Sequence, residues 1–361
     1  MILPISRSRN HLLLNPAPNQ LIYNTVIMKV AVFSCQAYEK LALDRFNTAF
    51  QYELVYFSEA LSAETVSLAA GCIAVSTFVS DHVDAGVLKA LAGLGTKLVT
   101  LRCAGHDSVD LKAASSNDIV TMRVPAYSPH AIAEYTVGIL FTLNRKIHSA
   151  WSRVQTGNFD LNGLVGSDVY GKTVGIMGTG RIGAAVAKVF KLGFHCHVIA
   201  NDLYPQPELQ GIGVEYVDRN TIFRRSDIIC LHCPLTSQTE RLINAETLRL
   251  MKPEVLLVNT SRGGLVDTPA LINALEHGQI RGCALDVYDG ERDLFFRKST
   301  MENINDPILK RLVGLPNVIL TGHQAFLTQE AIDAIAETTL KNIQNFMAGR
   351  LDVNLAVEKY N

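Results

Sequence analysis

The chain has 361 residues, of which 48% are hydrophobic and 19% charged, and its formal net charge at pH 7 is −1. This length accommodates two domains, and the composition is typical of a globular α/β protein and not of a disordered chain. The near-neutral charge argues against nucleic acid as a partner, and no apolar stretch approaches the ~20 residues of a membrane span.

The first 27 residues contain Arg7 and Arg9 but no acidic residue. We expect residues 1–27 to be a disordered extension, or the product of a start codon assigned too early. Their basic, acid-free composition leaves a transit peptide as the alternative. Seven cysteines, an odd number, are scattered through apolar runs, which indicates reduced thiols in the cytoplasm and not a disulfide framework.

From Met28 onward, short apolar runs alternate with helix-like segments. The runs predicted as strands are 30–33, 54–57, 72–75, 98–101 and 120–124. Strands that alternate with helices in this way predict a parallel, doubly wound sheet. A single long helix is then predicted over 125–150, with Pro129 near its start and an apolar stripe through Ala133, Val137, Leu140 and Phe141.

The next apolar run, 174–177, leads into Gly178, Gly180 and Gly183 in G-x-G-x-x-G spacing, and a helical pattern follows. The first glycine permits a tight turn, the second lets a pyrophosphate approach the backbone, and the third lets the helix pack close to the strand. Asp202 ends the following run, where its carboxylate can accept from an adenosine ribose hydroxyl and repels a 2′-phosphate. This order predicts a dinucleotide site for NAD and not NADP.

Further strands are predicted at 197–200, 227–231, 255–259, 282–287 and 318–321, which completes six with 174–177. Three polar side chains follow the last three of these strands: Arg262, Glu291 and His323. Ligands bind at the carboxyl ends of the strands in open α/β sheets. A guanidinium, a carboxylate and an imidazole at this edge suit hydride transfer to a ketone, which also needs a proton for the oxygen.

The tail after His323 has a helical stripe that ends near Phe346 and is too short for a domain of its own. We expect it to pack on the first unit. The predicted domains are therefore a discontinuous one, 28–127 with 324–361, and a dinucleotide-binding one, 128–323. His195 and His197 flank Cys196 but lack further ligands nearby in the sequence, so no metal site is expected.

Seven ordered motifs between Met28 and the C-terminal helix resemble the D-2-hydroxyacid dehydrogenases, and within them the D-lactate dehydrogenases. The motifs are Arg102-Cys-Ala-Gly105, Val124-Pro-Ala-Tyr127, Gly178-Thr-Gly-Arg-Ile-Gly183, His232-Cys-Pro-Leu235, Asn259-Thr-Ser-Arg-Gly263, Asp286-Val-Tyr-Asp-Gly-Glu-Arg-Asp-Leu-Phe295 and Gly322-His-Gln-Ala-Phe326. The resemblance implies two doubly wound parallel-sheet domains, with a Rossmann NAD-binding domain inserted in a flavodoxin-like substrate domain.

The resemblance also implies roles that fit the chemistry of the residues. Arg262 would hold the substrate carboxylate with its planar fork. His323 would protonate the carbonyl oxygen, and Glu291 would orient the imidazole and favour its charged form. The backbone at Ala104 and Gly105, with Tyr127, would also bind the carboxylate. The implied cofactor contacts are Gly178, Gly180, Arg181, Ile182, Gly183, Asp202, Cys233, Pro234, Thr239, Thr260, Ser261 and Asp286.

The expected activity is NADH-dependent, reversible reduction of pyruvate to D-lactate. One methylene in an apolar pocket discriminates by only ~10–200-fold, so glyoxylate or a branched 2-ketoacid is the first alternative substrate. A non-catalytic NAD-sensing protein, similar to the corepressors called C-terminal-binding proteins, is the alternative from another class. Relatives in the family are dimers or tetramers, so we expect a homodimer or homotetramer.

Overall fold

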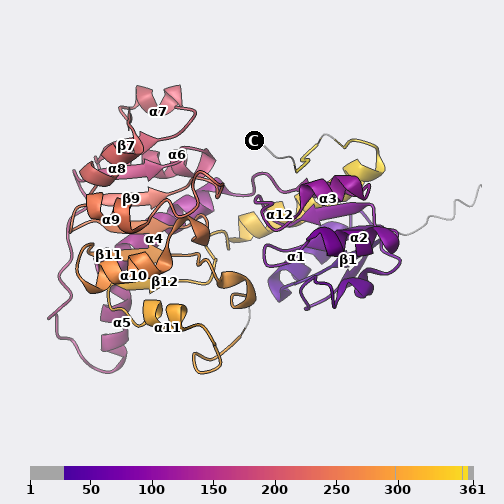
Figure 1. The fold of residues 1–361 in the computed structure, drawn as a ribbon, viewed down its shortest axis with the longest axis horizontal. Helices are drawn as coiled ribbons and strands as arrows, with labels where there is room; N and C mark the ends of the chain where they lie inside the picture. Colours follow the sequence, from indigo (N-terminus) through magenta and orange to yellow (C-terminus); the bar gives the residue numbers. More distant parts are fainter. Residues whose placement is uncertain (1–27, 297, 352, 357–361) are drawn as a thin grey trace, which may run out of the picture.

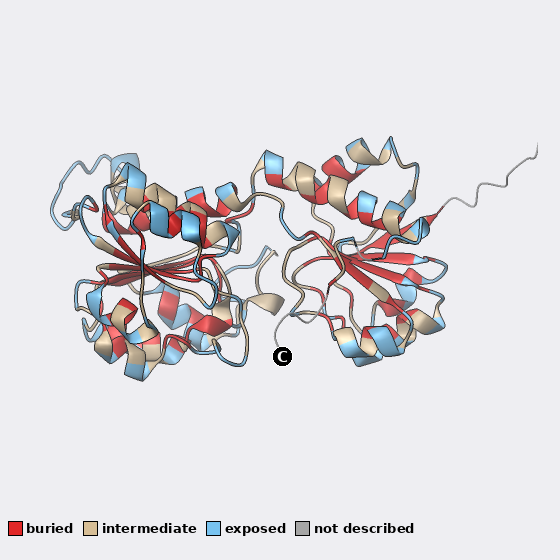
Figure 2. Cartoon of the chain, turned by 90° about the horizontal axis from the view of Figure 1, so that it is seen from above, coloured by how far each residue is buried: buried red, intermediate tan, exposed pale blue. Residues whose placement is uncertain are grey.

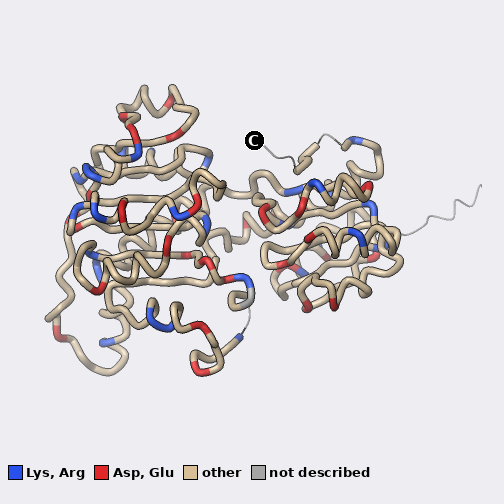
Figure 3. Tube along the Cα trace, in the orientation of Figure 1, with Lys and Arg blue, Asp and Glu red and all other residues tan. Residues whose placement is uncertain are grey.

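The computed structural model describes residues 28–296, 298–351 and 353–356, so the predicted extension at 1–27 lies outside the described residues. The chain forms two α/β domains, each built on a parallel sheet (Figure 1). In both domains the central strands are buried between helices whose outer faces are exposed, whereas the edge strands are partly exposed (Figure 2). Lysine and arginine are interspersed with aspartate and glutamate along both domains (Figure 3).

The first sheet has five strands in the order β2-β1-β3-β4-β5, the flavodoxin-like arrangement. Its strands are β1 (Lys29–Val32), β2 (Glu53–Tyr56), β3 (Ala74–Thr77), β4 (Leu98–Leu101) and β5 (Val120–Arg123). β3 and β4 are buried at every position, as expected for parallel strands covered on both faces. The helices of this domain before the glycine motif are α1 (Ala37–Asn47), α2 (Ala85–Gly93) and α3 (Leu111–Ser116).

The C-terminal helix α12 (Gln329–Met347) packs on α1, β4 and β5 of this first domain. Ala336, Leu340 and Ile343 are buried in one cluster with Val30 and Leu98. The yellow helix therefore lies among the indigo and purple elements in Figure 1, although it is about 200 residues away in sequence from β5. This packing supports the proposed discontinuous domain, 28–127 with 324–361.

The second sheet has seven strands in the order β12-β11-β10-β9-β6-β7-β8, which is the dinucleotide-binding order extended by one strand. The strands are β6 (Thr173–Met177), β7 (His197–Asn201), β8 (Glu215–Tyr216), β9 (Ile228–Leu231), β10 (Leu256–Asn259), β11 (Gly282–Leu285) and β12 (Val318–Leu320). The helices around this sheet are α4 (Pro129–Asn144), α5 (Ile147–Gln155), α6 (Arg181–Lys188), α7 (Pro207–Gly211), α8 (Arg219–Arg225), α9 (Ala245–Leu250), α10 (Thr268–Glu276) and α11 (Pro307–Val313).

Two features of this domain differ from the sequence predictions. The edge strand β8 was not predicted, because two residues carry no periodic signal. The single helix predicted over 125–150 is wrong: Ser128 caps α4, and Lys146, with φ 51°, separates α4 from α5. The chain turns there because the buried Asn144 side chain bonds Ser167 and so ties the end of α4 to a distant loop.

The predicted strands otherwise agree with the observed ones to within two residues; β3, for example, begins at Ala74 and not at residue 72. α4 contacts α6, β10 and β11, so it belongs to the second domain, as the proposed boundary at 127/128 requires. Among the described residues, no helix has both the length and the apolar character needed to cross a membrane.

Candidate active site

The turn after β6 has the geometry that a dinucleotide needs. Gly178 has φ +91°, a conformation that side chains with a Cβ rarely adopt. A Cβ on Gly183 would lie 1.9 Å from the carbonyl oxygen of Gly178, so only glycine lets α6 pack this closely. A Cβ on Gly180 would meet nothing within 4 Å, which leaves open space in front of its backbone. The turn therefore fits a pyrophosphate at the N-terminus of α6.

A pocket of about 640 Å³ opens beside this turn. Predicted residues that line it are Gly178, Gly180, Asp202, Cys233, Pro234 and Thr239. Asp202 accepts hydrogen bonds from the Thr179 backbone and hydroxyl and from the Tyr204 backbone at its two oxygens. A carboxylate at the end of β7 and an open backbone at Gly180 fit the adenosine ribose and the phosphates of NAD, respectively.

The last three strands bring the predicted catalytic residues to one edge of the second sheet. β10, β11 and β12 are neighbours, and Asn259, Leu285 and Leu320 lie in register across them. Arg262 and His323 each follow their strand by three residues, and Glu291 begins a short 3₁₀ turn after β11. Because adjacent strands are about 4.8 Å apart, these side chains start from backbone positions on the order of 10 Å apart.

His323 and Glu291 form a close pair. The Nδ1 atom of His323 lies 2.6 Å from Oε1 of Glu291, and the side chains are 15% and 17% exposed. The second carboxylate oxygen of Glu291 accepts from the backbone N–H of Tyr288 at 2.8 Å, which fixes its orientation. With Nδ1 directed at a carboxylate, Nε2 is the ring nitrogen left to face a substrate.

The turn that carries His323 is held by Asp286, which is fully buried. Its two oxygens accept from the Thr321 hydroxyl and from the backbone N–H groups of Gln324 and Ala325, at 2.6 to 2.9 Å. Burial raises the pKa of Asp286, and these hydrogen bonds oppose that rise. His323 itself has φ 54°, in the left-handed region that residues other than glycine seldom occupy. Asp286 thus supports a backbone conformation that the turn would not adopt unaided.

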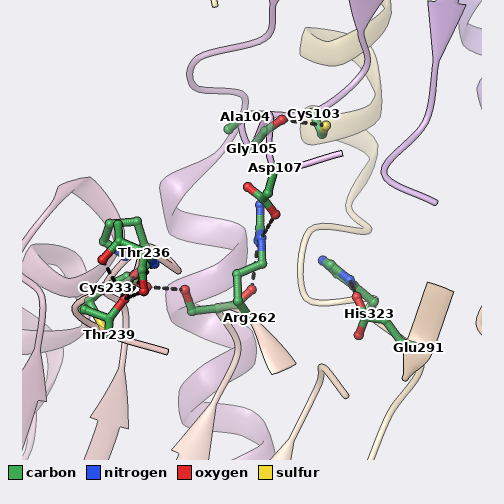
Figure 4. A network of polar contacts seen from close by, with 12 residues as sticks. Cys103, Ala104, Gly105, Asp107, Cys233, Thr236, Thr239, Arg262, Glu291 and His323 are labelled. Atoms are coloured by element: carbon green, nitrogen blue, oxygen red, sulfur yellow. Dashed lines mark hydrogen bonds and ion pairs between the residues drawn. The ribbon is translucent and has the colours of Figure 1, made fainter. Parts of the chain in front are cut away.

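Arg262 extends from the second domain to the first, where it meets Asp107 (Figure 4). Its Nε atom donates to Oδ2 of Asp107 at 2.9 Å, and Nη1 donates to the carbonyl of Ser261 at 2.8 Å. A Cβ on Gly105 would lie 1.9 Å from Nη2, so the guanidinium lies directly against the backbone of this glycine. Arg262 is therefore in contact with the loop that was predicted to bind the substrate carboxylate.

The loop at 103–107 is anchored by Arg102, whose side chain is completely buried at the end of β4. Its guanidinium donates to Glu39 at 2.8 Å and to the carbonyl of Phe33 at 2.8 Å. Arg123 donates to the carbonyl of Ala104 at 2.6 Å. A buried charge with all these partners is costly to move, so the start of the loop is rigidly placed.

Aromatic rings line the space around His323. Phe296 contacts the imidazole with ring centroids 5.8 Å apart, and Phe78 meets Phe296 edge-on at 4.8 Å. Phe326 packs against both Phe78 and Tyr127. Burial raises the pKa of the Tyr127 hydroxyl to about 12. These residues come from both domains, so the surroundings of His323 form only where the domains meet.

Comparisons with known proteins agree on one family. Residues 137–325 match the family described as D-isomer specific 2-hydroxyacid dehydrogenase, NAD binding domain. The chain is 51% identical over 331 residues to 2-hydroxyacid dehydrogenase homolog 1 of Schizosaccharomyces pombe, which covers 92% of this chain and all of the relative. The chain belongs to the D-2-hydroxyacid dehydrogenase family.

Solved structures support the same assignment. The apo-structure of D-lactate dehydrogenase from Escherichia coli superposes with a TM-score of 0.82 at 44% identity, over 91% of this chain and all of that one. A structure described as the pyruvate reductase of Chlamydomonas reinhardtii gives a TM-score of 0.83 at 40% identity, over 90% of this chain and 97% of that one. The protein is an NAD-dependent oxidoreductase of the D-2-hydroxyacid dehydrogenase family.

Within this dehydrogenase, the remaining predicted cofactor residues lie outside the pocket beside the glycine turn. Arg181 is exposed at the first turn of α6, and Ile182 packs against the cores of both domains. Thr260 is buried against the hydroxyl of Thr136 at 2.9 Å, and Ser261 donates to the carbonyl of Cys233 at 2.8 Å. Direct contact of these residues and of Asp286 with NAD stays a prediction.

The structure also adds residues to the site that sequence reasoning did not find. Asp107 and Phe78 lie next to the predicted site, and Tyr204, Gln206 and Arg219 line the pocket. Asp107 follows Gly105 by two positions, and a carboxylate beside a predicted anion-binding loop was a signal that could have been used.

Proposed function

We propose that this dehydrogenase reduces pyruvate to D-lactate with NADH, reversibly, with His323 as the proton donor. The observation that carries the proposal is the His323–Glu291 pair, joined at 2.6 Å beside a strand-end arginine. Relatives named D-lactate dehydrogenase and pyruvate reductase support pyruvate as the substrate.

In this mechanism Arg262 binds the substrate carboxylate through its planar fork, and the backbone N–H groups at Ala104 and Gly105 contribute from the other domain. Tyr127 assists from the end of β5. Because these groups fix the carboxylate, the neighbouring carbonyl carbon has one orientation toward the nicotinamide. Phe296, which packs against the imidazole and is itself covered by Phe78, reduces the access of water to His323.

NADH, when bound, supplies the hydride that adds to the carbonyl carbon. Nε2 of His323 gives its proton to the carbonyl oxygen, so that a ketone, a hydride and a proton yield the alcohol. Glu291 holds Nδ1 and stabilises the imidazolium before the proton leaves. In the reverse direction the neutral imidazole accepts the hydroxyl proton.

The cofactor would be held by the predicted set, with the glycine turn at the pyrophosphate and Asp202 at the adenosine ribose. Thr260, Ser261 and Asp286 are proposed for the nicotinamide half, and Cys233, Pro234 and Thr239 for the ribose side. The carboxylate of Asp202 disfavours the additional phosphate of NADP.

The proposal of a small substrate rests on the aromatic surroundings of His323. Phe78, Phe296 and Phe326 are rigid and bulky, which leaves less room for a branched side chain than for a methyl group. Glyoxylate and branched 2-ketoacids remain the alternative substrates for the same chemistry.

One assay tests the proposed function. The purified protein is given NADH with pyruvate, glyoxylate, 2-ketobutyrate or 2-ketoisocaproate, and the products are separated by chirality. We expect the highest kcat/KM with pyruvate and D-lactate as its only product. L-lactate, or a kcat/KM that favours 2-ketoisocaproate, would contradict the proposal.

We further propose a homodimer or homotetramer that works in the cytoplasm. Helix α5 has no buried residue in this chain, and its Trp151 side chain is 67% exposed beside Ile147 at 51%, which fits an interface with a second copy. All seven cysteines are unpaired, as is usual in a reducing compartment. Light scattering of the purified protein measures the assembly directly.

A further inference from the structure

The contact between Asp107 and Arg262 joins two domains at the proposed substrate anchor. Asp107 belongs to the loop after β4, and Arg262 lies 155 positions later, after β10. The ion pair is partly exposed, with 24% of the arginine side chain and 49% of the aspartate side chain accessible. The pair lies at the proposed substrate anchor, so Asp107 acts on the group that would bind the substrate carboxylate.

The geometry of the contact leaves part of the guanidinium free. Asp107 takes the Nε donor and the Ser261 carbonyl takes one donor of Nη1. Two hydrogen bonds from different directions fix the plane of the guanidinium. Among the residues that the structure describes, the donors of Nη2, which lies against Gly105, and the second donor of Nη1 have no partner and can bind another anion. Asp107 therefore occupies the Nε side of the guanidinium and leaves the end formed by Nη1 and Nη2 available.

Each member of the Asp107–Arg262 pair stabilises the charged form of the other. Burial alone would lower the pKa of Arg262, but nearby groups, of which the Asp107 carboxylate contributes most, hold the pKa above its ordinary value. Burial likewise would raise the pKa of Asp107, but the guanidinium outweighs it and holds that pKa below the usual range. Both shifts favour the charged forms of the two side chains.

From this geometry we infer that Asp107 is a positioning residue, which orients the Arg262 guanidinium for the 2-ketoacid carboxylate when the two domains are together. The inference rests on the proposed function, because it assigns Arg262 as the anchor. The substrate domain would then supply both the loop backbone that binds the carboxylate and the aspartate that aligns the arginine. In a similar way, Glu291 orients the His323 imidazole, but from within the second domain.

The test compares Asp107→Ala with Asp107→Asn. Alanine removes both the charge and the acceptor, whereas asparagine keeps an oxygen that can accept from Nε. We expect Asp107→Ala to raise KM for the preferred 2-ketoacid about 10–100-fold, with a smaller change in kcat, because the aligned anchor is lost. Asp107→Asn should stay within about threefold of the wild type, since the acceptor is retained. The dissociation constant of NADH should not change.

A second contact between the domains provides a matched control. Nη1 of Arg292 lies 2.6 Å from Nε2 of His82, an exposed residue of the first domain that does not touch Arg262. His82→Ala removes a cross-domain contact and leaves the anchor intact, so KM should match the wild type. An equal rise of KM in His82→Ala would show that loosened closure is the cause and would overturn the inference. A fall of KM in Asp107→Ala would mean that Asp107 competes with the substrate, which also overturns it.

Chemical labelling of Arg262 tests the inference without any measurement of catalysis. Phenylglyoxal reacts with the neutral guanidine form of an arginine side chain, and Asp107 stabilises the charged guanidinium form of Arg262. Mass spectrometry of the NADH-bound protein should show faster labelling of Arg262 in Asp107→Ala than in the wild type or His82→Ala. Unchanged labelling would overturn the inference. If the wild type reduces no 2-ketoacid, the proposed function fails, while the labelling result still shows whether Asp107 controls Arg262.

Discussion

His323 combines an unfavourable backbone conformation with a side chain that is held in one orientation. Its backbone is left-handed, at φ 54°, which costs roughly 1–3 kcal/mol for a residue with a Cβ. Its ring is held by Glu291 at Nδ1, and its backbone N–H donates to the carbonyl of Asp286 at 2.7 Å. The surrounding hydrogen bonds therefore maintain a conformation that a free turn would leave, and they aim the imidazole in a fixed direction.

Replacement of His323 by asparagine removes the proposed proton donor but keeps a residue type that tolerates the left-handed conformation. We expect kcat to fall about 10²–10⁴-fold, because general acid catalysis is lost. Binding of NADH, followed by its fluorescence, should be unchanged. His277→Asn is the matched control, since His277 is exposed at the end of α10 and lies just before the start of β11, whereas the site lies beyond the strand's carboxyl end. A His323→Asn enzyme with the wild-type rate would show that the proton comes from another group.

Among the elements, the turn between β6 and α6 contains two glycines that are needed for different physical reasons. Gly183 is required for packing, since a Cβ would lie 1.9 Å from the Gly178 carbonyl oxygen, whereas Gly180 has open space around it. One position therefore affects the fold, and the other affects only what approaches the turn from outside.

This difference gives a paired prediction. Gly183→Ala should lower the free energy of unfolding of the cofactor-free protein by about 1–3 kcal/mol, because overpacking displaces the helix. Gly180→Ala should leave that stability within about 0.5 kcal/mol but weaken NADH, because the methyl group faces the space proposed for the pyrophosphate. Urea unfolding and NADH titration measure the two effects. Equal destabilisation by both substitutions would contradict this assignment.

Most elements could be predicted because buried parallel strands are continuous apolar runs, so the strands around Val99 and Val258 were found from sequence alone. The gathering of Arg262, Glu291 and His323 at one sheet edge followed from their positions after strands. The break at Lys146 was missed because it depends on the distant partner of Asn144. Asp107 was missed although its place two residues after Gly105 was a usable signal, because the sequence does not show that its partner lies 155 positions away.

At the scale of the whole molecule, the stability of the fold depends on pH through groups that resist protonation. His232 is one such group: burial lowers its pKa from 6.5 to about 4, and its Nε2 has no hydrogen-bond partner among the described residues. The unfolded chain therefore binds a proton at this position at a higher pH than the folded protein does. The contribution of the neutral ring to stability is complete above pH 6.5 and is lost as the pH falls toward 4.

The cofactor-free wild type should accordingly lose stability more steeply than His232→Gln between pH 6.5 and 4. A shift of this size corresponds to at most about 3.4 kcal/mol, and the remaining solvent access of this half-buried residue reduces it. Urea unfolding at pH 7, 6, 5 and 4 measures the difference, with His277→Gln as the exposed control that should follow the wild type. Parallel curves for the wild type and His232→Gln would show that the pKa of this ring is the same in the folded and unfolded states.

The packing of α12 on β4 and β5 has a consequence for synthesis on the ribosome. Roughly 200 residues separate β5 from α12, and translation at about 5–20 residues per second adds them in about 10–40 s. During that interval the nascent first sheet has emerged, but the apolar surface that Leu340 and Ile343 later cover is still open. The second sheet, by contrast, is complete once β12 has emerged. The domain that starts first is therefore the one that finishes last, and it is the part of the nascent enzyme for which chaperones have most time to bind.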